Sequence, residues 1–310
     1  MQIGRDLLTS VFRYLCLGTG LYCNRMRFGR WGLALAGIVM CAVLLSNPRG
    51  ASAQPTDALD PQYNAWLDME NVSERYVDEP IVELWYYHQS LSTGAYSNMG
   101  TLRYYHPIRN PWGPWKGMFR FDQSYFNSYG PGINDSTSER YQRGNTMITV
   151  WGNHPNLFAN WHGDLGFRVV FPVGNQGQWA VGPQAGMSYQ TRKPAGKVGL
   201  SDFSPLARFM FGFNIKNDRF LKADEPPPER RLTLFPTLGF DLSPNTQLRF
   251  WDENGMTYSP SGGKWFIPID AMITHKVGNH LVLSLGVSRS VVDTFKQYKT
   301  NIYGKVSWYF

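Results

Sequence analysis

Cysteine and charge are both scarce in most of this 310-residue sequence. All three cysteines, Cys16, Cys23 and Cys41, lie within the first 53 residues, so the rest of the chain can form neither a disulfide framework nor a thiolate metal site. Charged residues make up 17% and aromatic residues 15% of the chain. A disordered chain has the opposite balance, rich in charge and poor in aromatics, so this composition excludes disorder.

Long apolar runs are absent beyond residue 53, which argues against a protein that crosses a membrane with helices. Before that point an unbroken apolar run, 31–45, follows three arginines and precedes Ala51 and Ala53. A charged region, an apolar region and small residues in this order predict a secretory signal peptide, 1–53, cleaved before Gln54, with an uncleaved anchor as the alternative. Met26 would begin a signal of ordinary length, so we expect the true start there.

Basic charge is largely confined to the same segment. It holds six of the 30 Lys and Arg residues and one of the 23 Asp and Glu residues, which leaves 24 basic and 22 acidic residues, a formal charge of +2, in residues 54–310. So small an excess of positive charge excludes nucleic acid as a partner. Residues 54–80 are acidic and form either a short helix or a linker ahead of the strands described next.

Apolar and polar residues alternate through much of 81–310. The last ten residues show this period-two pattern of a half-buried strand, with one parity occupied by Ile302, Gly304, Val306, Trp308 and Phe310. A terminal Phe that follows apolar residues at every second position resembles the last strand of bacterial outer-membrane barrels, which their insertion machinery recognises. The alternative, an edge strand of a soluble sandwich, would leave that edge exposed to aggregation.

The length of the alternating runs separates the two folds. Runs such as 264–277 and 279–292 reach 14 residues, whereas soluble strands average about 5 or 6 and tilted membrane strands need about 9 to 11. We therefore predict an all-β fold, an antiparallel transmembrane β-barrel of about 12 strands in 81–310, with 10 or 14 as alternatives and 54–80 as a periplasmic extension. The strands are expected at 81–90, 102–108, 118–126, 147–154, 165–173, 179–190, 207–215, 231–242, 246–253, 264–277, 280–291 and 301–310.

The lengths of the connections test this assignment. If the first strand begins and the last strand ends in the periplasm, short periplasmic turns should alternate with long outer loops along the chain. After residue 207 they do. Upstream, 191–206 is too long for a turn and 174–178 is too short for an outer loop, which indicates that strands near these residues are misplaced.

Three segments, Trp179–Gly186, Leu234–Phe240 and Gly262–Ile269, occur in an order that resembles the bacterial outer-membrane transporter-like β-barrel family. Its members are often labelled neuromedin U-like or meta-pathway phenol-degradation-like proteins. The similarity covers about residues 160–310 but departs at Asp270–Thr274, where the family has a Gly-Leu-Gly run. The resemblance implies a barrel with a channel for small, apolar or aromatic molecules, and it brings no site residues.

A hydrolytic site is the alternative from a different class. His88 and Ser90 share one face of a strand, as the base and nucleophile of outer-membrane phospholipases do. Those enzymes have Asn directly after Ser, where Leu91 stands here, so Asn98 could complete the set only if a loop returned it to His88. A histidine of an aromatic girdle is the other interpretation, and we predict no catalytic site, no cofactor and no metal site.

Charges of both signs occupy the parity that would face the lumen. A barrel of about twelve strands is narrower than the open 16- to 18-stranded porins, so such groups must pair across the interior or stay hydrated. We predict either a filled, salt-bridged lumen with a narrow, weakly anion-preferring path, or charges that form structural pairs alone. The lining residues are expected to be Arg120, Asp122, Arg168, Arg208, Arg231, Asp241, Arg249, Glu253, Lys264, Asp270 and Lys276.

The sequence thus favours a passive channel or transporter-like protein for small solutes in the bacterial outer membrane. Its expected partners are outer-membrane lipid, the barrel insertion machinery and the solutes themselves. A lipid hydrolase and a structural or export-partner barrel of an envelope complex are the alternatives.

Overall fold

The computed structural model describes residues 79–310, apart from 92–93, 132–140, 159–160, 174–175, 191–197, 218–229, 261, 279 and 295–297. The expected signal peptide with its cleavage site at Ala51, Ala53 and Gln54, and all but the last two residues of the 54–80 extension, lie outside these described residues. Among the residues described, no helix has the length and hydrophobicity needed to cross a membrane.

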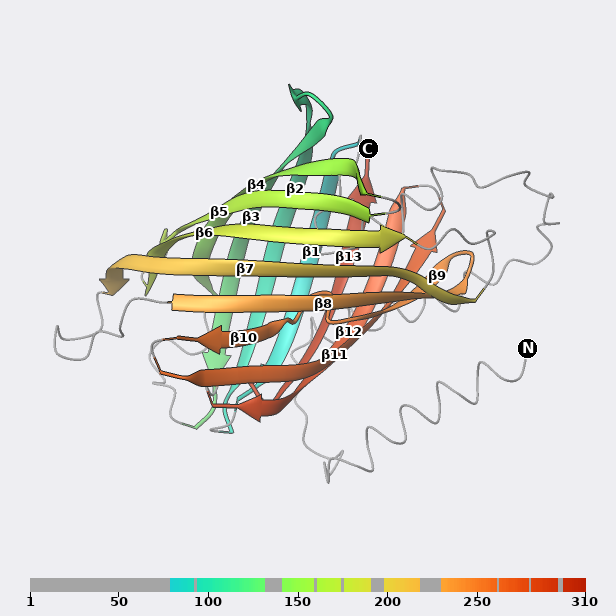
Figure 1. The fold of residues 1–310 in the computed structure, drawn as a ribbon. Coiled ribbons are helices and arrows are strands. Elements are labelled where there is room, and N and C mark those ends of the chain that lie inside the picture. The colour runs from blue at the N-terminus through green and yellow to red at the C-terminus, as the bar shows by residue number, and fades with distance from the viewer. Residues whose placement is uncertain are drawn as a thin grey trace, which may run out of the picture. The chain divides into compact units, whose positions relative to one another are not determined.

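Thirteen strands form a single antiparallel sheet in the described part of the chain (Figure 1). Most are longer than the sequence pattern suggested, because residues at their ends extend the same pairing. The strands are β1 (Ile81–Ser90), β2 (Tyr96–Trp112), β3 (Trp115–Tyr129), β4 (Gln142–Phe158), β5 (Trp161–Phe171), β6 (Gln176–Gln190), β7 (Gly199–Asn217), β8 (Arg230–Ser243), β9 (Thr246–Phe250), β10 (Met256–Ser259), β11 (Lys264–Val277), β12 (Leu281–Asp293) and β13 (Thr300–Tyr309).

The sheet closes on itself. β1 pairs with β2 on one side and with β13 on the other, with Ile81 opposite Tyr309 and Ser90 opposite Thr300. β9 and β10 together fill one place in the ring, because both pair with β8 and both pair with β11. The fold is therefore a closed antiparallel barrel with twelve strand positions, which confirms the predicted fold class and strand number.

The connections identify the two ends of the barrel. At the end that holds Pro80 and Phe310 four of the five connections have two or three residues, namely 113–114, 159–160, 244–245 and 278–280. At the other end 130–141 and 218–229 have twelve residues each. Short turns mark the periplasmic end of a single-chain barrel and long loops its extracellular end, so β1 begins and β13 ends on the periplasmic side.

Two of the predicted strand boundaries that differ from the structure lie beside the irregular connections upstream of residue 207. β6 begins at Gln176 rather than at 179, and β7 begins at Gly199 rather than at 207. Asp202 and Pro205 give 199–206 the composition of a loop, but Asp202 is buried in the interior and Pro205 pairs opposite Pro236. The irregular connection 191–206 thus shortens to 191–198, and no strand needs to be added or removed.

A third correction concerns the predicted strand 246–253. β9 ends at Phe250, and residues 251–255, called the inward segment below, leave the wall and fold into the barrel before β10 resumes the same position at 256. Trp251 makes the bend with a φ of 50°, unusual for a bulky residue, and its indole Nε1 donates to the Pro268 carbonyl oxygen at 2.8 Å. β10 occupies part of what the pattern assigned to the loop 254–263.

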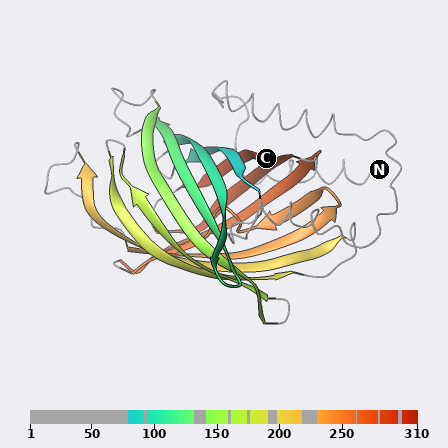
Figure 2. The ribbon, with the colours of Figure 1, turned by 90° about the horizontal axis from the view of Figure 1, so that it is seen from above.

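The two faces of the barrel wall have opposite character. Figure 2 shows the yellow and green strands curving round toward the cyan and red ones, and the side chains on the concave side are mostly polar and buried, as Thr101, Gln184 and Ser288 are. Apolar side chains dominate the exposed outer face: Leu84, Leu102, Leu165, Phe167, Phe211, Ile269, Ile273, Leu285, Ile302 and Trp308. An apolar outside around a polar inside is what a barrel needs in lipid.

Candidate functional site

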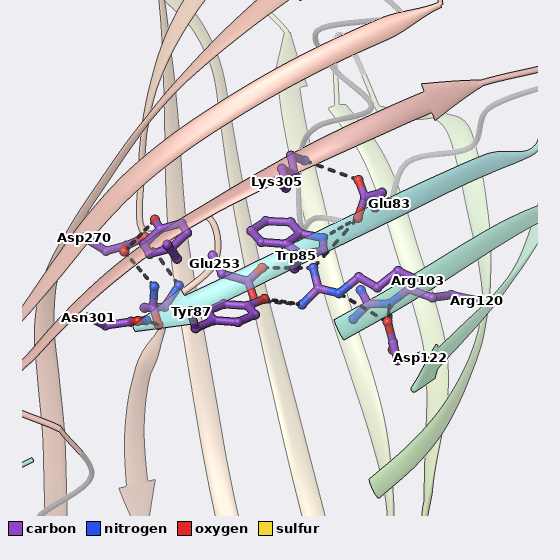
Figure 3. Close-up of polar contacts among 12 residues, drawn as sticks. Glu83, Trp85, Tyr87, Arg103, Arg120, Asp122, Glu253, Asp270, Asn301 and Lys305 are labelled. Carbon is purple, nitrogen blue, oxygen red and sulfur yellow. Dashed lines mark hydrogen bonds and ion pairs between the residues drawn. The ribbon is translucent and has the colours of Figure 1, made fainter. Parts of the chain in front are cut away.

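The interior side of β13, β1 and β2 carries a charged network centred on Glu83 (Figure 3). Alternation along β1 directs Glu83, Trp85 and Tyr87 inward, and register places Arg103 of β2 directly opposite Glu83. The Glu83 carboxylate accepts hydrogen bonds from Trp85 Nε1 at 2.7 Å, Tyr105 Oη at 3.1 Å, Lys305 Nζ at 3.3 Å and Ser307 Oγ at 3.3 Å. These four donors compensate a carboxylate that is only 2% exposed.

Arg103 extends the network in two directions. Its Nε lies 3.2 Å from Asp122 Oδ1 on β3, and both carboxylate oxygens of Asp122 also accept from Arg120 Nε, each at 2.9 Å. The Arg103 guanidinium also lies 4.3 Å from the centre of the Trp85 ring, a cation–π contact. Charges of alternating sign therefore follow the inner wall from Lys305 to Arg120.

The same arginine makes a contact across the lumen. Arg103 Nη2 donates to Glu253 Oε1 at 2.7 Å and Nη1 donates to Glu253 Oε2 at 3.1 Å, while the Tyr87 hydroxyl donates to Glu253 Oε1 at 2.7 Å. Glu253 belongs to the inward segment, which connects β9 and β10. In the ring of twelve strand positions, the position that β9 and β10 share is five steps away from β2. The bidentate ion pair thus joins two nearly opposite sides of the barrel.

The inward segment is held at its base by further polar contacts. Arg249 Nε donates to Asp252 Oδ1 at 2.9 Å and Arg249 Nη1 donates to Asp202 Oδ1 at 3.0 Å, with all three side chains fully buried. Asn254 Nδ2 donates to Asp270 Oδ1 at 2.9 Å, and Tyr303 Oη donates to the same oxygen at 2.8 Å. The segment is therefore held directly by Arg249 of β9 and Asp270 of β11, which are in turn bound by Asp202 of β7 and Tyr303 of β13, as well as by Arg103.

A cavity of about 320 Å³ lies beside the inward segment. Its lining comes from the extracellular halves of β4, β5, β6, β8 and β11, from the middle of β7, and from 253–255. Three arginines line it, Arg168, Arg208 and Arg231, together with apolar side chains. On the periplasmic side of the segment the interior is closely filled, since Gln247, Thr237 and Ser188 are buried along with Arg249.

The residues expected in the lumen occupy different places in it. Arg120, Asp122, Arg249 and Asp270 are buried parts of the networks, and Arg168, Arg208 and Arg231 line the cavity. Glu253 projects from the inward segment instead of from a strand. Asp241 accepts from Gln247 Nε2 at 3.2 Å, whereas Lys264 is exposed at the extracellular start of β11 and Lys276 is near the periplasmic end of the same strand.

Sequence reasoning missed five charged residues of the networks: Glu83, Arg103, Lys305, Asp202 and Asp252. The parity rule could have found Lys305, which alternates with the outward residues of β13. In β1 both faces carry apolar and aromatic residues between Ile81 and Tyr87, and polar residues on both faces from His88 to Ser90, so hydrophobicity alone does not say which face turns inward. Asp202 fell in the expected loop 191–206. Asp252 fell in the expected strand 246–253, at a position assigned to its apolar, outward face.

His88, Ser90 and Asn98 lie together on the outward parity near the extracellular ends of β1 and β2. Asn98 reaches His88 by cross-strand register, and His88 Nδ1 lies 2.7 Å from Asn98 Oδ1. The Ser90 hydroxyl donates to the Thr300 carbonyl oxygen at 3.5 Å rather than to the His88 ring. Stacking of His88 on Tyr96, and of Tyr96 on Tyr129, places the histidine in an aromatic band.

The residues expected to form the insertion signal lie on one line of the outer face. Ile302, Val306 and Trp308 are on the outward parity of β13, and Phe310 follows the strand with its side chain exposed. This line is available to a partner that contacts the barrel from the lipid side.

Three solved structures of bacterial outer-membrane proteins are similar to this chain in fold. An outer-membrane channel from Pseudomonas putida F1 matches with a TM-score of 0.57 at 14% identity, over 76% of this chain and 97% of that one. The KdgM porin matches at 0.42 and 10% identity over 74% and 99%, and outer membrane phospholipase A from Escherichia coli at 0.43 and 9% identity over 77% and 96%. Neither a protein-family model nor a curated protein matches the chain.

The closed fold, the apolar outer surface and the first of these similarities define a β-barrel of the bacterial outer membrane. Membership of an outer-membrane barrel class, predicted from the sequence, is therefore confirmed. Among the described residues, no group of three His, Cys, Asp or Glu side chains is arranged to hold a metal ion.

Proposed function

We propose that the protein is a passive channel for small solutes, with a narrow lumen that the inward segment constricts. The observation that carries this proposal is the cavity of about 320 Å³ on the extracellular side of the segment, which a solute from outside would reach first. The barrel has a polar, charged interior instead of an apolar core, and such an interior lets water and solutes enter.

We further propose that the solutes have apolar or aromatic parts. Met147, Val170 and Phe235 line the cavity and supply an apolar surface. The sequence resembles the transporter-like barrel family over about residues 160–310, and the fold is similar to that of a protein described as an outer-membrane channel. Both likenesses support the proposal without identifying a solute.

Planar-bilayer recording tests the channel. Purified barrel, first checked for a folded state by its faster migration before boiling on a detergent gel, should produce discrete conductance steps smaller than those of an open 16-stranded porin recorded in the same salt. Conductance indistinguishable from that of lipid alone would contradict the proposal and favour a structural or export-partner barrel.

A lipid hydrolase is a second candidate, favoured by the 2.7 Å contact between His88 and Asn98. A histidine oriented by a third group is what a nucleophile two residues away would need as its base. Against it stands the Ser90 hydroxyl, which is directed to the Thr300 carbonyl. Release of fatty acid from phospholipid vesicles by the folded parent and its loss in Ser90→Ala would establish this function, and absence of release from the parent would end it.

A further inference from the structure

The outer face of the barrel carries a polar row at the extracellular ends of β12, β13, β1, β2 and β3. Register places each member of the row directly opposite the next: Arg289, Thr300, Ser90, Tyr96 and Tyr129. They share the outward parity with Leu84 and Ile302, whose exposed side chains belong to the apolar outer surface. We propose that this row, called the outer rim below, binds together with Lys299 the phosphorylated headgroup of a lipid in the outer leaflet. The inference goes beyond the proposed channel and does not rest on it.

The outward side chains become more polar, row by row, toward the outer rim. The row two residues closer to the periplasm is mixed and consists of Val287, Ile302, His88, Asn98 and Asn127. The row four residues further down is almost entirely apolar and consists of Leu283, Val306, Leu84, Leu102 and Gln123. A lipid-facing surface that changes in this way leaves the hydrocarbon and enters the headgroup region.

The height of the outer rim agrees with this position. Thr300 and Trp308 lie on the outward parity of β13, eight residues apart, and Trp308 is exposed near the periplasmic end. Eight residues span about 27 Å along a strand, which is about 20 Å of height at a tilt of about 40°. Because the apolar band of such barrels is about 25 Å tall, a row about 20 Å above Trp308 lies near the outer boundary of that band.

The charge on the outward face at this end has a single sign. In the described strands, the Lys, Arg, Asp and Glu side chains of the outward parity are Arg143, Arg230 and Arg289, and no acidic residue is among them. All three arginines are exposed at extracellular strand ends. A charge on the lipid face is costly at the middle of the bilayer and much less so near its surface, so these positions also mark the headgroup level. The fixed charge there attracts anionic headgroups.

Two cations adjoin within the outer rim itself. Lys299 N donates to the Ser90 carbonyl oxygen at 2.7 Å, and Ser290 N donates to the Lys299 carbonyl oxygen at 3.1 Å, so Lys299 lies beside Arg289. Both cationic side chains are exposed, and neither forms an ion pair with any residue that the structure describes. The acidic residue of β12, Asp293, lies opposite Phe266, whose side chain is in the interior. A guanidinium beside an ammonium suits a phosphate, which the arginine can bind with two parallel hydrogen bonds.

Aromatic rings continue the surface from these cations. His88 stacks on Tyr96 with ring centres 5.6 Å apart, and Tyr96 stacks on Tyr129 at 5.5 Å. A tyrosine has an apolar ring and a polar tip, so a stack of them contacts both parts of a lipid at the level where headgroup and acyl chains meet. The acyl chains would then lie along the apolar row of Leu84 and Leu102 below. A free phosphate would leave that row uncovered, which favours a lipid as the occupant.

Native mass spectrometry of the folded barrel, released from a neutral detergent, tests the site. The barrel is incubated with lipid A, a phosphorylated disaccharide that carries acyl chains, and separately with the same lipid after removal of its phosphates. We expect the barrel to retain lipid A at least fivefold more than the dephosphorylated lipid, and equal retention of the two would overturn the proposal. Inorganic phosphate at the concentration of lipid A should not displace it. Displacement would show that the site takes free phosphate instead of a lipid.

Two variants and a matched control locate the binding. Arg289→Gln and Lys299→Gln should each lower the retention of lipid A by about fivefold, because each removes a charge-assisted contact. Both residues are exposed, so the variants should fold and show the heat-dependent gel shift. Lys116→Gln removes the same charge from an exposed residue at the periplasmic end of β3 and should retain lipid A like the parent. Unchanged retention in both folded variants, or an equal loss in Lys116→Gln, would overturn the assignment.

The measurement is separate from that of the channel. A barrel that retains lipid A through Arg289 and Lys299 but gives no conductance keeps the lipid site and loses the channel. A barrel that conducts but retains both lipids equally keeps the channel and loses the lipid site.

Discussion

Four side-chain donors from three strands converge on the carboxylate of Glu83. One of them, Lys305, is positively charged and buried, and a second buried cation, Arg103, lies next to the carboxylate. The single negative charge of Glu83 therefore lies beside two buried positive charges, those of Lys305 and Arg103. Its loss would take a close acidic partner from the buried Lys305 ammonium, which is far more costly than the loss of an exposed ion pair.

Glu83→Gln is therefore expected to destabilise the folded barrel by about 3–5 kcal/mol. The measurement is urea unfolding in detergent, followed by tryptophan fluorescence. Glu83→Gln combined with Lys305→Met should recover part of the loss, because the second change removes the ammonium that the first deprives of the Glu83 carboxylate. A single variant as stable as the parent would show that Lys305 and Arg103 do not depend on this carboxylate.

The parity rule is most reliable at the scale of single residues. It directed Arg120, Asp122, Arg208 and Arg249 inward from local alternation alone, and the structure has them on the inner face. It could not pair them, because the partners of Arg249, Asp202 and Asp252, come from another strand and from a break in the wall. Contacts between residues 47 or 150 positions apart have no local signature.

At the scale of elements, the inward segment 251–255 is the feature that the proposed channel function places across the lumen. Its tip is tied to the far wall by Arg103 and Tyr87, and its base by Arg249 and Asp270. In the sequence the segment looked like the end of a strand followed by a loop, because Asp252–Asn254 is as polar as a lumen-facing run. Nothing in the local pattern reports that a strand is interrupted and then resumed in the same position.

Glu253→Ala should raise single-channel conductance at least twofold, because it removes both contacts that hold the tip of the segment across the lumen. The value is recorded in planar bilayers in 1 M potassium chloride. Asp293→Ala, at the outer end of β12, is the control and should conduct like the parent. Unaltered conductance in folded Glu253→Ala would mean that the segment does not limit the path.

The whole barrel could be predicted in outline because membrane strands repeat one simple pattern, whose period and length were visible from Lys264 to Phe310. β11 matched its expected bounds, and β12 and β13 did so to within two residues. The pattern weakened around 199–206, where a bulge between Leu200 and Asp202 shifts the parity of the residues on either side. Closure itself was inferred from strand length and was not visible in any single segment.

Assembly is also a property of the whole molecule. Phe310→Ala is expected to reduce the amount of heat-modifiable barrel recovered from outer membranes severalfold, since the exposed terminal Phe belongs to the proposed insertion signal. Leu242→Ala, at another exposed apolar residue near the periplasmic end, serves as the comparison and should assemble normally. If both variants assemble like the parent, Phe310 is not needed for such a signal.

The uneven distribution of charge around the interior has a consequence for anything that passes through it. Along β13 and β1–β3 positive and negative groups alternate, whereas the arginines of β5, β7 and β8 line the cavity on the facing part of the wall. The two sides of the interior therefore arrange their charged groups differently. A molecule with one charged end would meet different surroundings on the two sides, so its two ends would not be interchangeable inside the barrel.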